Sequence, residues 1–107
     1  MASIGGMGNL LKQAQEMQAR MAKVQEDLAN KTVQGSAGGG MVQVTVNGQF
    51  NLTALKIEAT AINAEEKDML EDLIIAAVND GMRKARELAA AEMAKLTGGL
   101  KIPGLMP

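Results

Sequence analysis

Basic side chains that could bind a ligand gather in two segments of the chain. The denser cluster lies near residue 85, and a looser set lies in the first quarter of the sequence. Lysine and arginine in such groups can neutralise the phosphates of a nucleic-acid backbone. An exposed face laced with ion pairs is the alternative, because acidic residues stand beside the cations in both segments. The candidate nucleic-acid contacts are Lys12, Arg20, Lys23, Arg83, Lys84 and Arg86.

The residue types that the chain lacks narrow its remaining chemistry. There is no His and no Cys, which excludes Ser–His and Cys–His nucleophiles and zinc sites with nitrogen or sulfur ligands. The acidic residues between Glu65 and Asp72 suit a helix start and lack the spacing of a calcium loop. The glycine-rich segment 35–40 has neither the lysine nor the helix of a phosphate-binding loop. We expect no enzyme, cofactor, metal or small-molecule substrate.

The composition predicts one domain with an unusual core. Phe50 is the only aromatic residue among 107, and nine Met supply much of the apolar volume. Aromatic side chains make the largest single contributions to burial, and a chain of this size buries only about two-thirds of its unfolded surface. Both features favour self-association. The formal net charge of −1 argues against a uniformly cationic nucleic-acid binder.

The sequence also carries signals about location. No apolar run approaches the roughly 20 residues of a membrane span. The first eight residues lack the basic and apolar regions of a signal peptide, and the absence of Cys fits a reducing compartment. We expect a cytoplasmic protein without membrane contact.

An apolar seam predicts a helix over about residues 7–29. Its apolar residues alternate at spacings of three and four, as positions a and d do over three heptads. Such a seam either docks the helix on its own sheet or pairs two chains, and the poor monomer core favours a homodimer. The expected dimer interface consists of Leu10, Met17, Met21, Val24 and Leu28.

The apolar period changes to two between residues 31 and 58, which predicts three strands. Val42, Val44 and Val46 share one face of the middle strand, and Asn47-Gly48 is a strong signal for a two-residue hairpin. The apolar phase then slips, which predicts a β-bulge near Thr53-Ala54. Short connections between consecutive strands make the sheet an antiparallel meander.

A second long helix is predicted from Asn63 to about Leu96. Asn63 with Glu66 three residues later has the spacing of a capping box, and Gly98-Gly99 stops the helix. Gly81 inside it either lets another element approach closely or marks a kink. The prediction is an α+β fold of order α-β-β-β-α, with a three-stranded antiparallel meander between two long helices. We expect residues 1–107 to form a single domain in which 1–6 and 98–107 are flexible.

Several segments match a known pattern in order and spacing: Met7–Gln18, Val44–Gly48, Asp68–Ile74, Ala76–Asp80 and Ile102–Pro107. In these segments the chain resembles the YbaB/EbfC family of bacterial nucleoid-associated proteins. The resemblance implies the same α-β-β-β-α fold, a tweezer-like homodimer and DNA binding near protruding helical parts. The chain departs from the family pattern at Phe50 and Leu52, where we expect more polar strand residues.

The leading hypothesis is a nucleoid-associated protein that binds duplex DNA as a homodimer, largely through backbone contacts. It would contribute to chromosome organisation and gene regulation. Sequence readout should be weak, because no recognition-helix signature is visible. The alternative is a protein-interaction scaffold or adaptor with incidental DNA contact, since Met-rich apolar stripes form adaptable surfaces. One continuous positive stripe would favour DNA, and interspersed charge beside a bare apolar patch would favour a protein partner.

Overall fold

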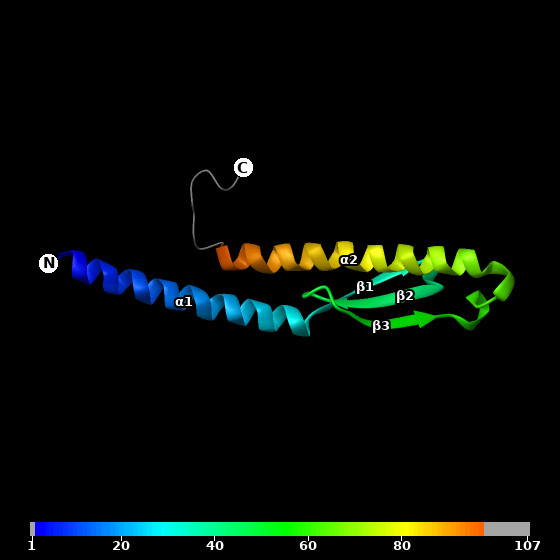
Figure 1. The fold of residues 1–107 in the computed structure, drawn as a ribbon, viewed down its shortest axis with the longest axis horizontal. Helices are drawn as coiled ribbons and strands as arrows, with labels where there is room; N and C mark the ends of the chain where they lie inside the picture. Colours follow the sequence, from blue (N-terminus) through cyan, green and yellow to red (C-terminus); the bar gives the residue numbers. More distant parts are fainter. Residues whose placement is uncertain (1, 98–107) are drawn as a thin grey trace, which may run out of the picture.

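The computed structural model, which describes residues 2–97 and the side chains of residues 6–96, consists of two long helices and a three-stranded antiparallel sheet (Figure 1). The second helix covers one face of the sheet, and the first extends away from its end. The elements are α1 (Ala2–Asn30), β1 (Thr32–Ala37), β2 (Val42–Asn47), β3 (Leu52–Ile57) and α2 (Lys67–Thr97). The strands form a meander in the order β1-β2-β3. The predicted α-β-β-β-α fold is therefore confirmed. The expectation of a flexible segment over residues 98–107 lies outside the described residues.

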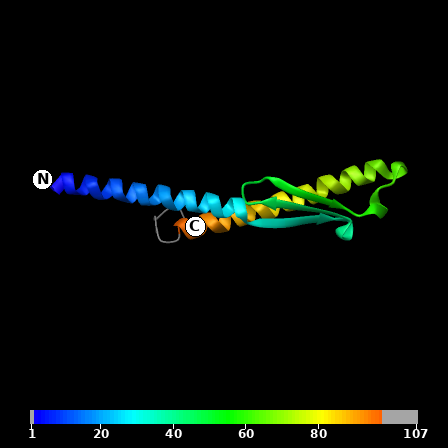
Figure 2. The ribbon, with the colours of Figure 1, turned by 90° about the horizontal axis from the view of Figure 1, so that it is seen from below.

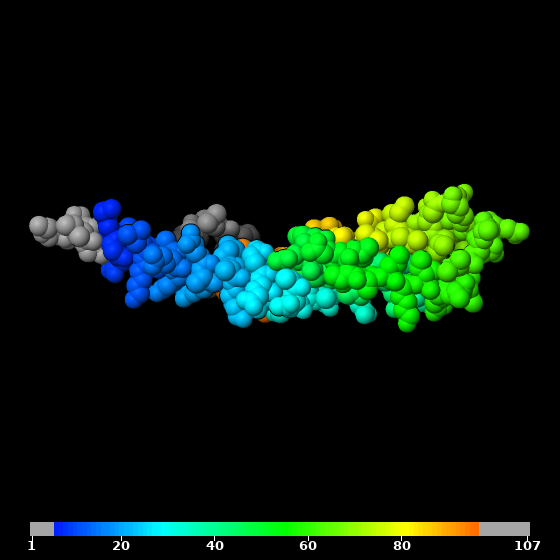
Figure 3. Space-filling model, turned by 60° about the horizontal axis from the view of Figure 1, so that its bottom comes forward, coloured from blue at the N-terminus to red at the C-terminus, as the bar shows by residue number. Residues whose placement is uncertain are grey.

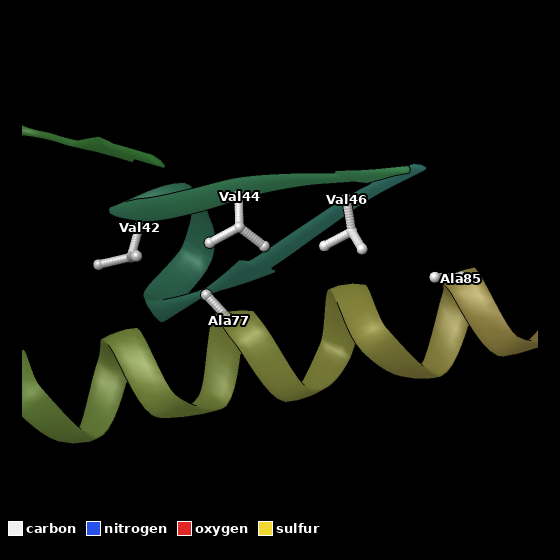
Figure 4. Packing of buried hydrophobic residues seen from close by; sticks show 5 residues of the cluster. All are labelled: Val42, Val44, Val46, Ala77 and Ala85. Carbon is white, nitrogen blue, oxygen red and sulfur yellow. The ribbon is translucent and has the colours of Figure 1, made fainter. Parts of the chain in front are cut away.

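The hydrophobic core lies between one face of the sheet and α2. Val42, Val44 and Val46 of β2 are at most 1% exposed, and all three point toward the helix (Figure 4). Ala77 and Ala85 of α2 meet them and are fully buried. Complete burial of one valine side chain contributes about 1.5 kcal/mol or more. Partly buried apolar residues extend this core: Val33, Ala37, Ile57, Leu70, Leu73, Ile74, Val78 and Met82.

Two glycines let α2 and the sheet approach closely. A Cβ atom added to Gly35 of β1 would lie 2.3 Å from the backbone nitrogen of Gly81 and 2.4 Å from the carbonyl oxygen of Ala77. A Cβ atom on Gly81 would lie 2.9 Å from Cγ2 of both Val44 and Val46. The helix runs through Gly81 without interruption. Close approach, and not a kink, therefore explains the glycine in α2.

The turn between β2 and β3 is longer than predicted. Four residues, Gly48–Asn51, separate the strands instead of two. The Asn47 side chain accepts hydrogen bonds from the backbone nitrogens of Gln49 and Asn51 at 2.9 and 3.0 Å. Phe50 lies in this turn with φ of 68°, not in the strand. The expected bulge is present, because the β2–β3 register shifts between Thr45↔Ala54 and Val46↔Leu52.

Helix α2 also starts slightly later than predicted. Asn63 caps a short 3₁₀ turn, Ala64–Glu66, by accepting a hydrogen bond from the backbone nitrogen of Glu65 at 3.0 Å. The α-helix itself begins at Lys67. The cap is therefore at the predicted residue, and the first turn is tighter than an α-helix.

Helix α1 is anchored by its C-terminal turn and projects away from the sheet. Leu28 is 3% exposed and packs against Gly48, whose backbone nitrogen donates a 2.8 Å hydrogen bond to the Leu28 carbonyl oxygen. The N-terminal half of α1 extends past the end of α2 (Figure 2). The helix begins at Ala2, before the predicted start at residue 7, so Gly5, Gly6 and Gly8 lie within it. The molecule is a rod of 78 × 27 × 16 Å (Figure 3).

The edge strand β3 leaves an apolar strip open beside the core. Leu52 pairs with Val46 and Leu55 pairs with Val44, so both leucines point to the face that α2 occupies. Helix α2 packs mainly against β1 and β2. Leu52 and Leu55 therefore remain 45% and 48% exposed.

Candidate nucleic-acid interface

Arg83 and Lys84 belong to a ladder of ion pairs on α2. Arg83 Nη2 lies 3.0 Å from Asp80 Oδ1, and Arg83 Nη1 lies 2.8 Å from Glu87 Oε1. Lys84 Nζ lies 3.2 Å from Asp80 Oδ2 and donates a 3.1 Å hydrogen bond to the carbonyl oxygen of Gln34. The partners stand three or four residues apart, as neighbours on a helix surface do. A phosphate that contacts either cation therefore competes with an internal carboxylate, and for Arg83 with two.

Asp80 ties this ladder to the sheet. Its Oδ2 accepts a 3.1 Å hydrogen bond from the backbone nitrogen of Ser36 on β1. This bond, followed by those from Arg83 and Lys84, lowers the pKa of Asp80 to about 2. The hydrogen bond to Asp80 raises the pKa of Arg83. The most basic cluster of the sequence is thus organised around a carboxylate that stays charged.

Three of the six candidate cations have no ion-pair partner among residues 6–96. They are Lys12, Arg20 and Arg86, and all three are exposed. Lys23 is also exposed but has an ion pair with Asp27 at 3.3 Å. An unpaired exposed cation can approach a phosphate without losing an internal contact. These side chains are therefore better suited to the predicted role than Arg83 and Lys84.

A groove of about 440 Å³ separates the second half of α1 from the end of α2. Arg20 and Lys23 line it from α1, and Lys95 lines it from α2. The fold therefore brings two of the candidate cations beside a third that the sequence interpretation did not include. Asp27 and Glu92 line the same groove, so its charge is mixed.

Glu92 joins the end of α1 to the last turns of α2. It is 6% exposed, and its carboxylate pairs with Lys31 and lies 3.3 Å from Lys95 Nζ. The hydrogen bond with Lys31 lowers the pKa of Glu92 and raises that of Lys31. The sequence interpretation missed this cluster, although Glu92 continues the apolar stripe of Ala85 at helical spacing. A charge at such a position needs a partner.

The candidate cations do not form one continuous patch. Lys84 lies against β1, whereas Arg20 lies beside Leu96, about 18 Å further along α2. Anions are interspersed with the cations in both places. This is the arrangement expected for an exposed face with ion pairs, the alternative to a phosphate-binding patch.

The fold divides the seam that was expected to pair two chains. Leu28 is buried within its own chain. Leu10 and Met21 are 65% and 36% exposed, and Met17 and Val24 are half-buried. Chain pairing through the four outer residues stays a prediction.

Comparison with known proteins gives matches along nearly the whole chain. The model of the YbaB/EbfC DNA-binding family matches residues 4–100. The chain belongs to this family. A nucleoid-associated protein of Desulfotalea psychrophila is 54% identical over 99 residues, which cover 92% of this chain and 93% of the relative. A nucleoid-associated protein of Syntrophobacter fumaroxidans is 53% identical over 97 residues, which cover 91% and 88%.

A solved structure has the same arrangement. An uncharacterized protein from Helicobacter pylori superposes with a TM-score of 0.71 at 26% identity, covering 86% of this chain and 94% of that one. The YbaB/EbfC family is a DNA-binding family and not a known enzyme family. Within the described part of this member, no helix is long and apolar enough to cross a membrane. In the same residues, no group of three or more His, Cys, Asp or Glu side chains is placed to hold a metal ion.

Proposed function

We propose that this YbaB/EbfC protein binds duplex DNA as a homodimer, largely through phosphate contacts. Membership of a DNA-binding family carries the proposal. The names of its relatives, which are nucleoid-associated proteins, support a place in the nucleoid. Chromosome organisation and gene regulation in the cytoplasm are the roles that we propose for it there.

Helix α1 supplies the main contact surface in this proposal. Lys12 and Arg20 are exposed and unpaired within the described residues, and they lie on the helix that projects from the sheet. Lys23 pairs with Asp27 at the surface, and exposed ion pairs hold their partners weakly. DNA phosphates can therefore replace the carboxylate at little cost.

Helix α2 supplies a second, weaker contact. Arg86 is free within the described chain, whereas Arg83 and Lys84 share Asp80. The mixed charge limits each chain to a few phosphate contacts, and a homodimer doubles them. Few contacts to phosphates and none to base edges give little sequence preference.

We propose the open strip beside β3 as the surface for chain pairing, in place of the α1 seam that the sequence predicted. Asp80 and Lys84 face the edge of β1, so the opposite flank of α2, which carries Val78 and Met82, faces β3. This flank and the half-exposed Leu52 and Leu55 form a contiguous apolar surface. A second copy that covers it would supply the apolar burial that a core without aromatic residues lacks.

A protein-interaction scaffold is the second candidate function. Its support is the combination of interspersed charge with large apolar side chains on the surface, such as Leu10 and Leu11 of α1. The apolar strip beside β3 does not add to this support, because pairing with a second copy would already cover it. The scaffold or adaptor function would become the favoured one if the protein showed no affinity for DNA at low salt.

A mobility-shift titration of duplex DNA at several salt concentrations tests the DNA proposal. Each phosphate contact contributes about −0.9 to the slope of log affinity against log salt, so two or three cations per chain in a dimer should give roughly −4 to −5. Replacing Lys12 and Arg20 together with Ala should weaken binding to all duplexes about equally and flatten the slope. Replacing Arg83 and Lys84 together should have a smaller effect, because both cations are already partnered.

The matched control is Lys67→Ala, which removes an exposed cation at the far end of α2. It should leave affinity and slope unchanged. Wild-type binding that neither double variant alters would refute the assigned contacts. Absence of binding even at low salt would refute the DNA proposal in favour of the scaffold.

A further inference from the structure

Helix α1 presents an apolar face that the described residues leave open. Leu10 is 65% exposed although it belongs to the heptad seam. Propensity alone gives marginal stability to a helix in water, and most helices depend on a packed face. The N-terminal half of α1 lies beyond the anchor at Leu28 and extends past the end of α2 (Figure 1). A partner for this face is therefore needed.

Two hollows follow one another along this face. The groove between the helices is lined by Arg20 and Val24 of α1 and by Leu96 of α2. A second hollow of about 490 Å³ continues from Arg20 toward the N-terminus and is lined by Leu10, Gln13, Ala14, Glu16 and Met17. Because Arg20 lines both, the two hollows form one track from the end of α2 to Leu10. We call this surface the α1 track.

We propose that residues 98–107, the segment that follows α2, dock along the α1 track. Leu96 already lies at one end of the track, so the segment starts where it must dock. Ten helix residues from Arg20 to Leu10 span about 15 Å. Ten extended residues reach about 33 Å. The segment is therefore long enough, and Gly98-Gly99 allows the chain to change direction after the helix.

The composition of the segment fits the track. Four of its residues, Leu100, Ile102, Leu105 and Met106, are large and apolar, as the seam residues of α1 are. Its single charged residue is Lys101, and the track carries the carboxylate of Glu16. Pro103 restricts the backbone before binding, which reduces the conformational entropy lost on docking.

Tethering favours this segment over a second copy of α1. A short flexible connection gives an effective concentration on the order of millimolar. A second chain at micromolar concentration competes poorly with a tethered segment for the same apolar face. Lys12 does not line the track, so docking leaves it free for phosphate, whereas Arg20 lines both hollows and lies beside the docked segment. The test of docking needs no DNA, so its outcome can be separated from that of the DNA-binding proposal.

Disulfide trapping tests the docking directly, because the chain contains no Cys. A variant that combines Met17→Cys with Leu105→Cys should form an intrachain disulfide in a glutathione redox buffer. Residue 26 lies nine positions from Met17, on the opposite side of α1. The matched control, Glu26→Cys with Leu105→Cys, should therefore stay reduced. Mass spectrometry and non-reducing electrophoresis distinguish an intrachain bond from a covalent dimer.

Three outcomes would overturn the proposal. Equal cross-linking of both pairs would mean that the segment samples space without docking. No cross-linking of the Met17 pair would mean that it does not reach the track. Covalent dimers from the pair, or from Met17→Cys alone, would assign the track to a second copy.

Hydrogen exchange gives a second, independent measurement. A chain that ends after Thr97 should exchange the amides of residues 7–21 roughly tenfold faster, the change expected for loss of one buried apolar side chain. Leu105→Ser with Met106→Ser in the full chain should have the same effect. Lys101→Ser, which removes no apolar contact, should cause a smaller change. Unchanged exchange in the shortened chain would overturn the proposal even if DNA binding is normal.

Discussion

At the scale of single residues, two carboxylates determine what the cations of this protein can do. Asp80 accepts hydrogen bonds from the Ser36 backbone, Arg83 and Lys84. Glu92 holds Lys31 and Lys95 near the junction of the helices. The strongest concentration of positive charge in the sequence is therefore the least available in the structure. Cations without such a partner are the better contacts for phosphate.

Asp80 should make the stability of the protein depend on acid pH. Folding lowers its pKa from 3.8 to about 2, so the folded state favours the charged carboxylate. Its stabilising contribution is complete above about pH 4 and is lost as the pH falls through about 2. Asp80→Asn should therefore lower the urea midpoint near neutral pH and have progressively less effect below pH 4.

The control for this prediction is Asp72→Asn, which removes an exposed carboxylate elsewhere on α2. It should have little effect at any pH. A midpoint difference between wild type and Asp80→Asn that stays constant from pH 7 to about pH 2 would contradict the role given to the charge.

At the scale of elements, the periodicity of apolar residues correctly predicted the positions of the central strand and the second helix. The valines of β2 and the apolar stripe of α2 placed their elements correctly, because each pattern directly reflects one buried face. The turn after Asn47 was predicted two residues too short. Its length depends on Gly48 binding the end of α1, a contact between distant segments.

The candidate site was less predictable than the fold, because it too depends on contacts between residues that are distant in the sequence. The basic residues could be identified by type and spacing. Their pairing depends on contacts such as Ser36 with Asp80 and Lys31 with Glu92, which join residues 44 and 61 positions apart. No local pattern contains that information, although the charge of Glu92 on an apolar stripe was a usable signal.

The packing of α2 on β1 should make two glycine substitutions act in opposite directions. Gly35→Ala places a Cβ atom against the backbone of α2, which cannot move aside as a side chain can. It should lower the free energy of unfolding by about 1–3 kcal/mol. Gly8→Ala meets nothing within 4 Å inside α1 and should stabilise the helix by up to about 1 kcal/mol. Urea unfolding and circular dichroism measure both effects, and a neutral Gly35→Ala would contradict the close approach.

At the scale of the whole molecule, a long projecting helix and a half-covered sheet occur in the same chain. The rod of 78 Å has much surface for its volume. Its apolar side chains lie open in two separate places, along α1 and beside β3. Different partners can therefore cover the two surfaces. The segment after α2 can reach the first, and a second copy suits the second.

The final prediction concerns the strip beside β3. Light scattering at micromolar concentration should give twice the 11.2 kDa chain mass for the wild type. Leu52→Glu with Leu55→Glu should give the mass of one chain, because four charges would face each other across the pair of strips in a dimer. Both leucines are about half exposed, so the single chain should keep its helicity. Leu11→Glu, an equally apolar and more exposed position on α1, should leave the dimer intact.

The monomeric variant should also lose about half of the salt slope for DNA, since it presents half of the phosphate contacts. A dimer that survives both β3 substitutions but dissociates with Met17→Glu would instead assign chain pairing to the heptad seam of α1.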